Sequence, residues 1–146
     1  MNYSVVEMNE SHVASIAQLE KECFSSPWSE NAIREELANP NSHFLVAQGN
    51  EVFGYIGVQE ICGEAYITNV AVFTEHRRIG AGRALLKSAV DGARARGCEF
   101  ITLEVRKSNS AALSLYISEG FEEAGIRKNF YTAPVEDAVL YTKRFE

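Results

Sequence analysis

A glycine-rich segment near the middle of the chain has the composition of an anion-binding loop. Residues 77–83 read Arg-Arg-Ile-Gly-Ala-Gly-Arg and precede a stretch with helical periodicity. Glycines at a helix start let backbone N–H groups approach an anion, and the helix dipole adds about half a positive charge there. The segment therefore predicts a pyrophosphate site, and a tight strand-to-helix turn with solvated arginines is the alternative interpretation.

Two common nucleotide-binding loops do not match this segment. A P-loop requires Gly-Lys followed by Ser or Thr, which the segment does not contain, and a dinucleotide-binding fingerprint requires a third glycine where this chain has Leu85. We therefore expect the anion to be held by a different arrangement.

The cysteines and histidines do not have the spacing of a disulfide framework or a metal site. Cys23, Cys62 and Cys98 are odd in number, far apart and outside any Cys-x-x-Cys pair, and the three histidines show no His-x-x-x-His spacing. We expect reduced, mostly buried cysteines and no metal.

The charge of the chain is unevenly distributed. The 146 residues carry a net charge of −6, which argues against a protein that binds nucleic acid by neutralising phosphates. Residues 1–40 hold seven acidic and two basic side chains, whereas residues 76–107 hold eight basic and three acidic ones. The basic segment is expected to bind an anion and the acidic segment a cationic partner. No run of about 18 apolar residues predicts a membrane span, and the first ten residues lack the features of an export signal.

Hydrophobic periodicity and turn residues predict one α/β (α+β) domain over residues 1–146, with a mixed, mainly antiparallel central sheet flanked by helices. Ser29 is expected to cap the second helix, with Trp28 and Ile33 placed as a hydrophobic staple. Helices are expected at 11–24, 29–37, 82–96 and 111–118, and strands at 3–8, 43–48, 52–61, 65–73, 100–106, 121–127 and 138–145.

Several motifs in the same order resemble a known enzyme family. The pattern Arg77-x-x-Gly80-x-Gly82 follows a strand that ends Asn-Val-Ala-Val at 69–72. Downstream stand Leu-Glu-Val-Arg at 103–106, Ser-Asn at 108–109, Leu-Tyr at 115–116 and Gly-Phe at 120–121. These motifs are similar to those of the GCN5-related N-acetyltransferase (GNAT) superfamily, and in particular of the RimI-type ribosomal-protein alanine N-acetyltransferases. The resemblance covers nearly the whole chain and implies the GNAT fold with acetyl-CoA as co-substrate.

The resemblance implies catalytic roles for Glu104 and Tyr116. Alternation along residues 100–106 places Glu104 opposite the apolar face of its strand, so an exposed or ion-paired glutamate is the alternative to a general base. Tyr116 would protonate the leaving thiolate, and a core tyrosine with its hydroxyl at the edge is the alternative, compatible with the first.

The same resemblance implies the acetyl-CoA contacts. The strand at Val70, Ala71 and Val72 would splay and offer backbone N–H groups to the thioester carbonyl, and Asn109 would bind the pantetheine arm. Helical solvated charge is the alternative for Arg83 and Lys87, and an ordinary strand pair is the alternative at 70–72. The residues expected to wrap the pyrophosphate are Arg78, Ile79, Gly80, Ala81, Gly82 and Arg83.

The acceptor is expected in a groove between residues 25–29 and the loop 129–136, with Trp28 and Tyr131 as contacts. Packing as a staple and packing at a strand end are the alternatives for these two residues. The resemblance implies cytoplasmic transfer of acetyl to the N-terminal α-amine of a protein, with a basic ribosomal protein beginning with alanine as the first candidate. A lysine or small-amine acetyltransferase and a non-catalytic acyl-CoA-binding regulator are the alternatives. Phe130 and the segment 132–135 depart from the family pattern at positions that would contact the acceptor.

Overall fold

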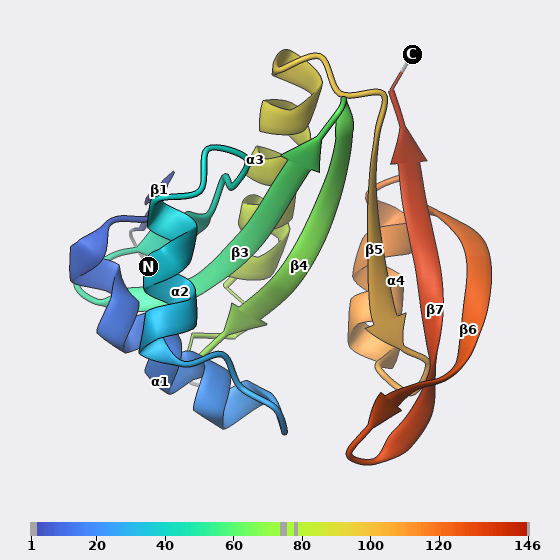
Figure 1. Cartoon of the computed structure of the whole chain (residues 1–146), viewed down its shortest axis with the longest axis horizontal. Helices are drawn as coiled ribbons and strands as arrows, with labels where there is room; N and C mark the ends of the chain where they lie inside the picture. The colour runs from blue at the N-terminus through green and yellow to red at the C-terminus, as the bar shows by residue number, and fades with distance from the viewer. Residues whose placement is uncertain (1–2, 74–75, 78, 146) are drawn as a thin grey trace.

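The computed structural model describes residues 3–73, 76, 77 and 79–145, and its helices and strands follow the expected order (Figure 1). The elements are β1 (Ser4–Glu7), the 3₁₀ turn η1 (Glu10–His12), α1 (Val13–Cys23), α2 (Glu30–Leu37), β2 (Leu45–Gln48), β3 (Val52–Ile61), β4 (Glu64–Val72), α3 (Ala81–Ala95), β5 (Phe100–Arg106), α4 (Ser110–Ser118), β6 (Glu122–Thr132) and β7 (Val135–Arg144).

One mixed sheet runs through the described part of the chain in the order β1-β2-β3-β4-β5-β7-β6. The strands β2, β3 and β4 form the expected antiparallel meander. Only the pair β4–β5 is parallel among the described strand pairs, because α3 crosses over between these two strands. The predicted fold class, a mixed and mainly antiparallel sheet flanked by helices, is confirmed.

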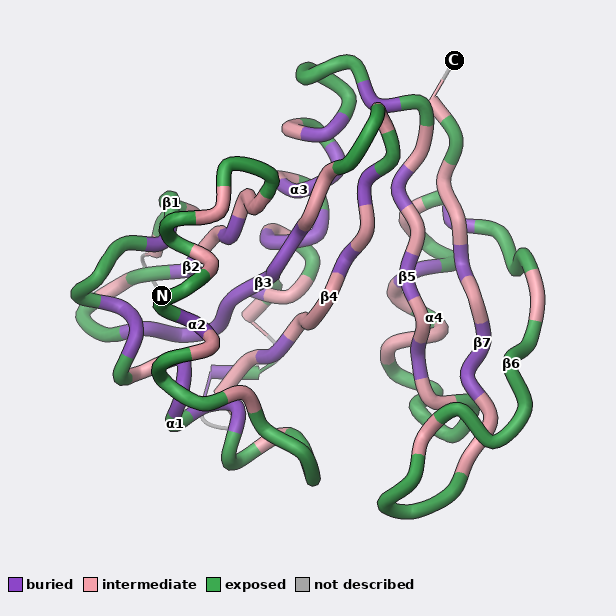
Figure 2. The backbone as a smooth tube through the Cα atoms, viewed as in Figure 1, coloured by how far each residue is buried: buried purple, intermediate pink, exposed green. Residues whose placement is uncertain are grey.

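The helices cover both faces of the sheet and bury two apolar cores. Ile16, Leu19 and Ile33 from α1 and α2 are fully buried on one face. On the other face, α3 contributes Leu85 and Leu86 to a second cluster. Each such side chain contributes roughly 1.5–3 kcal/mol by leaving water. In Figure 2 the buried segments run along β3, β4, β5 and β7, whereas the edge strand β6 is largely exposed.

Local sequence signals set the helix ends as expected. The Ser29 hydroxyl accepts a hydrogen bond from the Ala32 N–H at 3.1 Å and caps α2. Trp28 packs against the same core cluster as the fully buried Ile33. Gly97, with φ 86°, follows Arg96, the C-cap of α3, in the left-handed conformation that ends many helices. Each of these three signals depends on neighbouring residues, which is why the sequence alone predicts it.

The last hairpin differs from the expectation. A loop was expected at 129–136, but β6 continues to Thr132 and β7 begins at Val135. Asn129 has φ 53° and lies within an irregularity of the β6–β7 register between Arg127 and Tyr131. Most of β6 is exposed, so its residues lack the alternating pattern that reveals a strand in sequence.

The three cysteines are free, but only Cys98 is buried. Cys62 is exposed because it occupies the tight β3–β4 turn, where it has φ 52° and precedes Gly63 at φ 78°. The expectation of mostly buried cysteines is therefore wrong for Cys62. None of the described helices has the length and apolar character needed to span a membrane.

Candidate active site

The strands β4 and β5 separate and open a cavity between them. Their parallel pairing covers only Glu64–Ile67 with Phe100–Leu103, although β4 continues to Val72 and β5 to Arg106. Figure 1 shows the two ribbons diverging from their paired ends. The cavity has a volume of about 970 Å³ and is lined by β4, β5, the first turn of α3, α4, the end of α1 with the α1–α2 loop, and the β6–β7 hairpin.

A bulge in β4 lies at the start of the separation. The β3–β4 register shifts between Gly57 and Val58, which pair with Asn69 and Ile67, so Thr68 is the extra residue. The Thr68 hydroxyl is buried and has no hydrogen-bond partner among the described residues. The bulge therefore directly follows Ile67, the last residue of β4 that pairs with β5.

Beyond the bulge, one edge of β4 faces the cavity. The Phe73 N–H donates to the Phe53 carbonyl of β3 at 2.8 Å. Because backbone groups alternate between the two edges of a strand, Val72 presents its N–H and carbonyl on the opposite edge. There the Val72 carbonyl accepts a hydrogen bond from Arg77 Nε at 3.1 Å. The Val70–Val72 segment thus combines ordinary pairing with β3 on one edge and cavity-facing backbone on the other.

The glycine-rich segment forms the N-terminus of α3 at the cavity. Gly80 precedes the helix with φ 83°, a conformation that glycine adopts without steric cost, and its carbonyl accepts the first helical hydrogen bond from Ala84 N at 2.9 Å. Gly80, Ala81 and Gly82 all line the cavity. The first N–H groups of α3 have no helical partners and are oriented to bind an anion.

The arginines of this segment have different surroundings. Arg83 forms an ion pair with Glu119 and donates to the Ser118 hydroxyl at 3.0 Å, and Lys87 lies 3.3 Å from Glu119. The expected contact Ile79 is half-buried and packs on the core, and Arg78 lies outside the described residues. The described anion site therefore consists mainly of backbone N–H groups, with Arg83 held toward the end of α4.

Glu104 projects from β5 beside the cavity with its side chain only 9% exposed. Its Oε1 accepts a hydrogen bond from the Tyr66 hydroxyl at 2.7 Å. Its Oε2 is buried and accepts no hydrogen bond from the described residues, and the Arg127 Nε at 3.6 Å is too distant for one. One carboxylate oxygen therefore has a hydrogen-bond donor, and the other is a buried acceptor without a donor among the described residues.

Tyr116 lines the same cavity from α4 and is 6% exposed. Its ring packs 5.7 Å from that of Phe121 and 6.4 Å from that of Tyr141, measured between ring centroids. Burial raises the pKa of Tyr116 to about 12, so its hydroxyl keeps its proton at neutral pH. Tyr116 is thus a core tyrosine whose hydroxyl is available as a proton donor. Asn109 caps α4 by accepting from Ala112 N at 3.2 Å and also lines the cavity.

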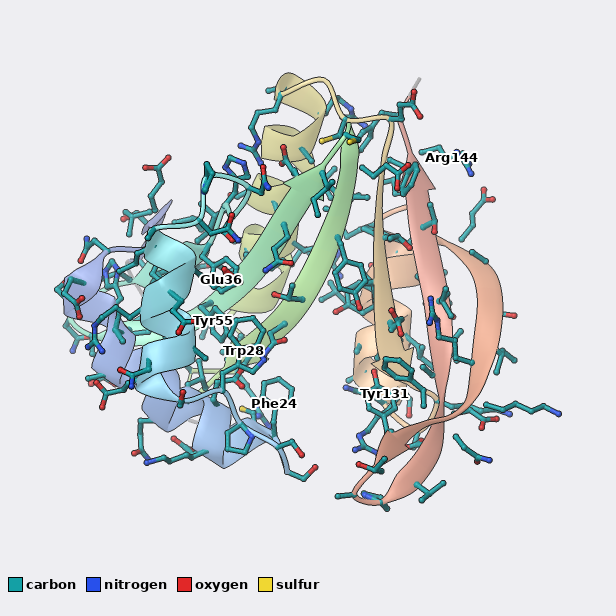
Figure 3. All side chains as sticks on the ribbon, in the orientation of Figure 1. Phe24, Trp28, Glu36, Tyr55, Tyr131 and Arg144 are labelled. Carbon is teal, nitrogen blue, oxygen red and sulfur yellow. The ribbon has the colours of Figure 1, made fainter. Side chains whose placement is uncertain are left out.

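Aromatic residues stand on both sides of the cavity mouth. Figure 3 shows Phe24 and Trp28 on one side of the gap and Tyr131 on the other, and all three residues line the cavity. The Trp28 ring lies 6.0 Å from that of Phe44, while the Arg106 guanidinium lies 4.4 Å from the centroid of the Tyr131 ring. Burial and the nearby Glu104 carboxylate raise the pKa of Tyr131.

Sequence reasoning did not identify two residues of this site as functional, Tyr66 and Glu20. Tyr66 was missed because its partner Glu104 lies on a different strand, and only the β4–β5 pairing brings the two together. Burial and the hydrogen bond to Glu104 raise the pKa of Tyr66 well above the usual value of a tyrosine. Glu20 is fully buried although it is a glutamate. The sequence did contain a signal for Glu20, because an ionisable residue stands on the apolar face of α1, four residues after Ile16.

Several charges of the polarised sequence are paired or buried within the fold. Among the acidic residues of the first segment, Glu10 binds Arg34 through contacts of 2.9 and 3.1 Å, and Glu20 is buried. In the basic segment, Arg96 binds Glu60 and Arg106 binds Glu136. The two segments therefore present less net charge to a partner than the sequence indicates.

The fold and the cavity between the separated strands define an acetyltransferase of a known family. A profile of the Acetyltransferase (GNAT) family matches residues 13–121, and the chain belongs to this family. It is an acetyl-CoA-dependent N-acetyltransferase.

Known proteins are similar to this chain over most of their length. It is 37% identical over 124 residues to the ribosomal protein bS18 alanine N-acetyltransferase of Escherichia coli (strain K12), covering 84% of each protein. It is 36% identical over 135 residues to the N-alpha-acetyltransferase RimI of Mycobacterium tuberculosis, covering 88% of this chain and 82% of that protein. The crystal structure of the Escherichia coli ribosomal-protein-S18-alanine N-acetyltransferase matches with a TM-score of 0.90 and 31% identity, covering 98% of this chain and 94% of that one. The resemblance to RimI-type enzymes is confirmed.

Proposed function

We propose that this chain transfers an acetyl group from acetyl-CoA to the N-terminal α-amine of a protein, and that a ribosomal protein beginning with alanine is its acceptor. Relatives at 36–37% identity carry the names of such enzymes. The single observation that carries the proposal is the Glu104 carboxylate beside the cavity, with Oε1 held by Tyr66 and Oε2 without a donor among the described residues.

An α-amine suits a carboxylate base better than a lysine side chain does. The α-amine has a pKa of about 8 and the lysine amine about 10.4, so the α-amine needs only mild assistance to lose its proton. The Glu104 carboxylate would take this proton, directly or through a water molecule. The Tyr66 hydroxyl would hold the carboxylate in one orientation during the transfer.

The residues around the cavity fit acetyl-CoA. Acetyl-CoA supplies an acetyl thioester and carries negatively charged phosphates. The N–H groups at the start of α3, from Gly80 to Gly82, would bind the pyrophosphate, with Arg78, Ile79 and Arg83 completing the loop. The cavity-facing edge of β4 at Val70–Val72 would bind the pantetheine arm together with Asn109.

Two further groups would act on the reacting atoms. The Val72 N–H would donate to the thioester carbonyl, and one such preorganised donor contributes about 3 kcal/mol in comparable acyl transfers. The Tyr116 hydroxyl would donate a proton to the departing sulfur. The Tyr116 assignment can be tested by a side-chain variant, whereas the Val72 N–H belongs to the backbone and is retained in any substitution except proline.

Trp28 and Tyr131 would form opposite walls of the acceptor entrance. We infer one N-acetyltransferase domain over residues 1–146, which works in the cytoplasm without a metal, without binding nucleic acid directly and without a membrane. The expected basic character of the acceptor rests on the other acidic residues of the segment 1–40, since Glu20 is buried and Glu10 is paired with Arg34.

Mass spectrometry of two peptides incubated with acetyl-CoA tests the proposal. Both peptides begin with alanine followed by a basic segment containing lysine, and one has a blocked N-terminus. The expected result is a single acetyl group on the α-amine of the free peptide and none on the blocked one. Equal labelling of lysine in both peptides would show a lysine acetyltransferase, and binding of acetyl-CoA without any labelling would favour a regulator.

A further inference from the structure

A fully buried carboxylate lies on the acceptor side of the cavity, away from Glu104. The Glu20 side chain projects from α1 into the apolar cluster that contains Ile16, Leu19 and Ile33, yet it also borders the cavity. Burying a carboxylate costs several kcal/mol unless donors surround it. Its position on an apolar helix face therefore requires a specific set of partners.

Three donors from different parts of the fold meet this carboxylate. Its Oε1 accepts a hydrogen bond from the backbone N–H of Trp28 at 2.9 Å. Its Oε2 accepts two hydrogen bonds, from the Tyr55 hydroxyl at 2.6 Å and from Asn69 Nδ2 at 2.7 Å. Tyr55 belongs to β3, and Asn69 follows the bulge residue Thr68 in β4. The carboxylate thus connects the α1–α2 loop to the strand that borders the cavity.

Glu20 also holds the other end of the same loop. Its backbone carbonyl accepts a hydrogen bond from the Phe24 N–H at 3.0 Å, where α1 ends. Glu20 therefore anchors the segment 24–28 at both ends. Its backbone carbonyl binds the Phe24 N–H, and its carboxylate binds the Trp28 N–H. Four of its five residues line the cavity, and Figure 3 shows Phe24 and Trp28 facing the gap across from Tyr131.

We propose that Glu20 is a positioning residue for the acceptor, whose carboxylate fixes the segment 24–28 against the β4 bulge and so sets the width of the acceptor entrance. This proposal rests on the proposed function, because it assigns the entrance to a peptide. Only a carboxylate accepts from all three donors, since a glutamine in its place would turn an N–H₂ group toward at least one of them. Glu20 touches neither Glu104 nor Tyr116 among its hydrogen-bond partners, so we expect it to affect peptide binding more than the chemical step.

The variant Glu20→Gln tests this role against a matched control, Glu36→Gln. Glu36 is a half-buried glutamate of α2 that also accepts from three side chains, those of Asn39, Ser42 and Gln59, but it does not line the cavity. Both variants replace one oxygen of a hydrogen-bonded carboxylate by an amide nitrogen. A general loss of stability would affect both, whereas positioning of the entrance concerns Glu20 alone.

Two measurements separate positioning from stability. In the acetylation assay, we expect Glu20→Gln to raise the peptide KM about tenfold, the effect of losing one charge-assisted hydrogen bond, while kcat and the acetyl-CoA Kd change less than about threefold. Trp28 is the only tryptophan of the chain, so acrylamide quenching of its fluorescence reports directly on the segment 24–28. Quenching should increase in Glu20→Gln and stay at the wild-type level in Glu36→Gln.

A wild-type peptide KM or wild-type quenching in a folded Glu20→Gln protein would overturn the proposal, as would an equal rise in KM for Glu36→Gln. If Glu20→Gln does not fold, Asn69→Ala removes one donor and leaves two, and it should raise the peptide KM in the same direction, whereas an unchanged KM would refute the role. If the wild-type protein leaves the peptide unmodified, the proposed acceptor is wrong, and the quenching comparison then decides the role of Glu20 by itself.

Discussion

Replacing Gly54 with alanine should displace β4 at the point where it borders the cavity. Gly54 of β3 pairs with Val72, and a Cβ atom added to Gly54 would lie 2.6 Å from the Ala71 carbonyl oxygen and 3.1 Å from the Val72 Cα. Ordinary contacts begin near 3.4 Å, so β4 would have to move by about 0.8 Å. Both neighbours are backbone atoms, which cannot rotate away as a flexible side chain would.

The expected cost follows from this overlap. Overpacking of this kind destabilises a fold by about 1–3 kcal/mol, which for a domain of this size lowers Tm by roughly 3–10 °C. The shift also moves the Val70–Val72 edge toward the cavity, and a displacement near 1 Å reduces catalysis by up to about 100-fold. We therefore expect a lower Tm together with a fall of at least about tenfold in kcat/KM.

Gly125→Ala is the matched control for this prediction. Gly125 lies in β6, where an added Cβ would meet no atom within 4 Å. The Tm of Gly125→Ala should stay within about 2 °C of the wild-type value, because alanine lowers the conformational entropy of the unfolded chain slightly and causes no clash in the folded one. Thermal unfolding followed by circular dichroism and steady-state kinetics with saturating acetyl-CoA provide both numbers. A Gly54→Ala protein with wild-type Tm and kcat/KM would refute the argument that β3 and β4 leave no space at this position.

Three other expectations concern the catalytic groups and the pH dependence. Glu104→Gln should lower kcat by about 10²–10⁴-fold and leave the acetyl-CoA Kd from calorimetry within about threefold, and a kcat near wild type would remove Glu104 from the base role. Tyr116→Phe should slow single turnovers with little change in acetyl-CoA affinity, and an unchanged rate in a chemistry-limited assay would exclude Tyr116 as the acid. The fold raises the pKa of Tyr116 to about 12 from an ordinary 10.0. Because a raised pKa favours the folded state only while the group is protonated, stability should be constant below pH 10 and fall as pH rises toward 12. Urea unfolding across this range should show a smaller fall for Tyr116→Phe, and an identical fall would contradict the pKa shift.

The helices and the meander could be predicted from the sequence because their signals are local. The cap at Ser29 acts on the N–H three residues later, and the alternation of residues 100–106 correctly turns Glu104 away from the apolar face of β5. The final hairpin could not be bounded in the same way. Its strand β6 is an exposed edge, so its length is set by pairing with β7 and leaves no hydrophobic pattern.

The candidate site was predictable in its parts but not in its arrangement. The anion loop at residues 77–83 and the candidate base Glu104 follow from residue type, spacing and family resemblance. The Tyr66–Glu104 hydrogen bond joins residues 38 positions apart, and the bonds of Glu20 to Tyr55 and Asn69 span 35 and 49 positions. No sequence period reports such contacts, because each depends on which strands become neighbours in the sheet.

The order of elements, the glycine-rich helix start and the family of the chain can be predicted from the amino-acid sequence, since each rests on neighbouring residues or on motifs in a fixed order. The separation of β4 and β5 after a few paired residues, which creates the cavity, is a property of the folded chain. The fold also determines which charged residues pair with one another. Opposite charges far apart in the chain, such as Arg96 and Glu60 or Arg83 and Glu119, meet on packed elements. A polarised sequence thus becomes a fold in which many charges are paired internally, because attraction between charges depends on their distance in space and not along the chain.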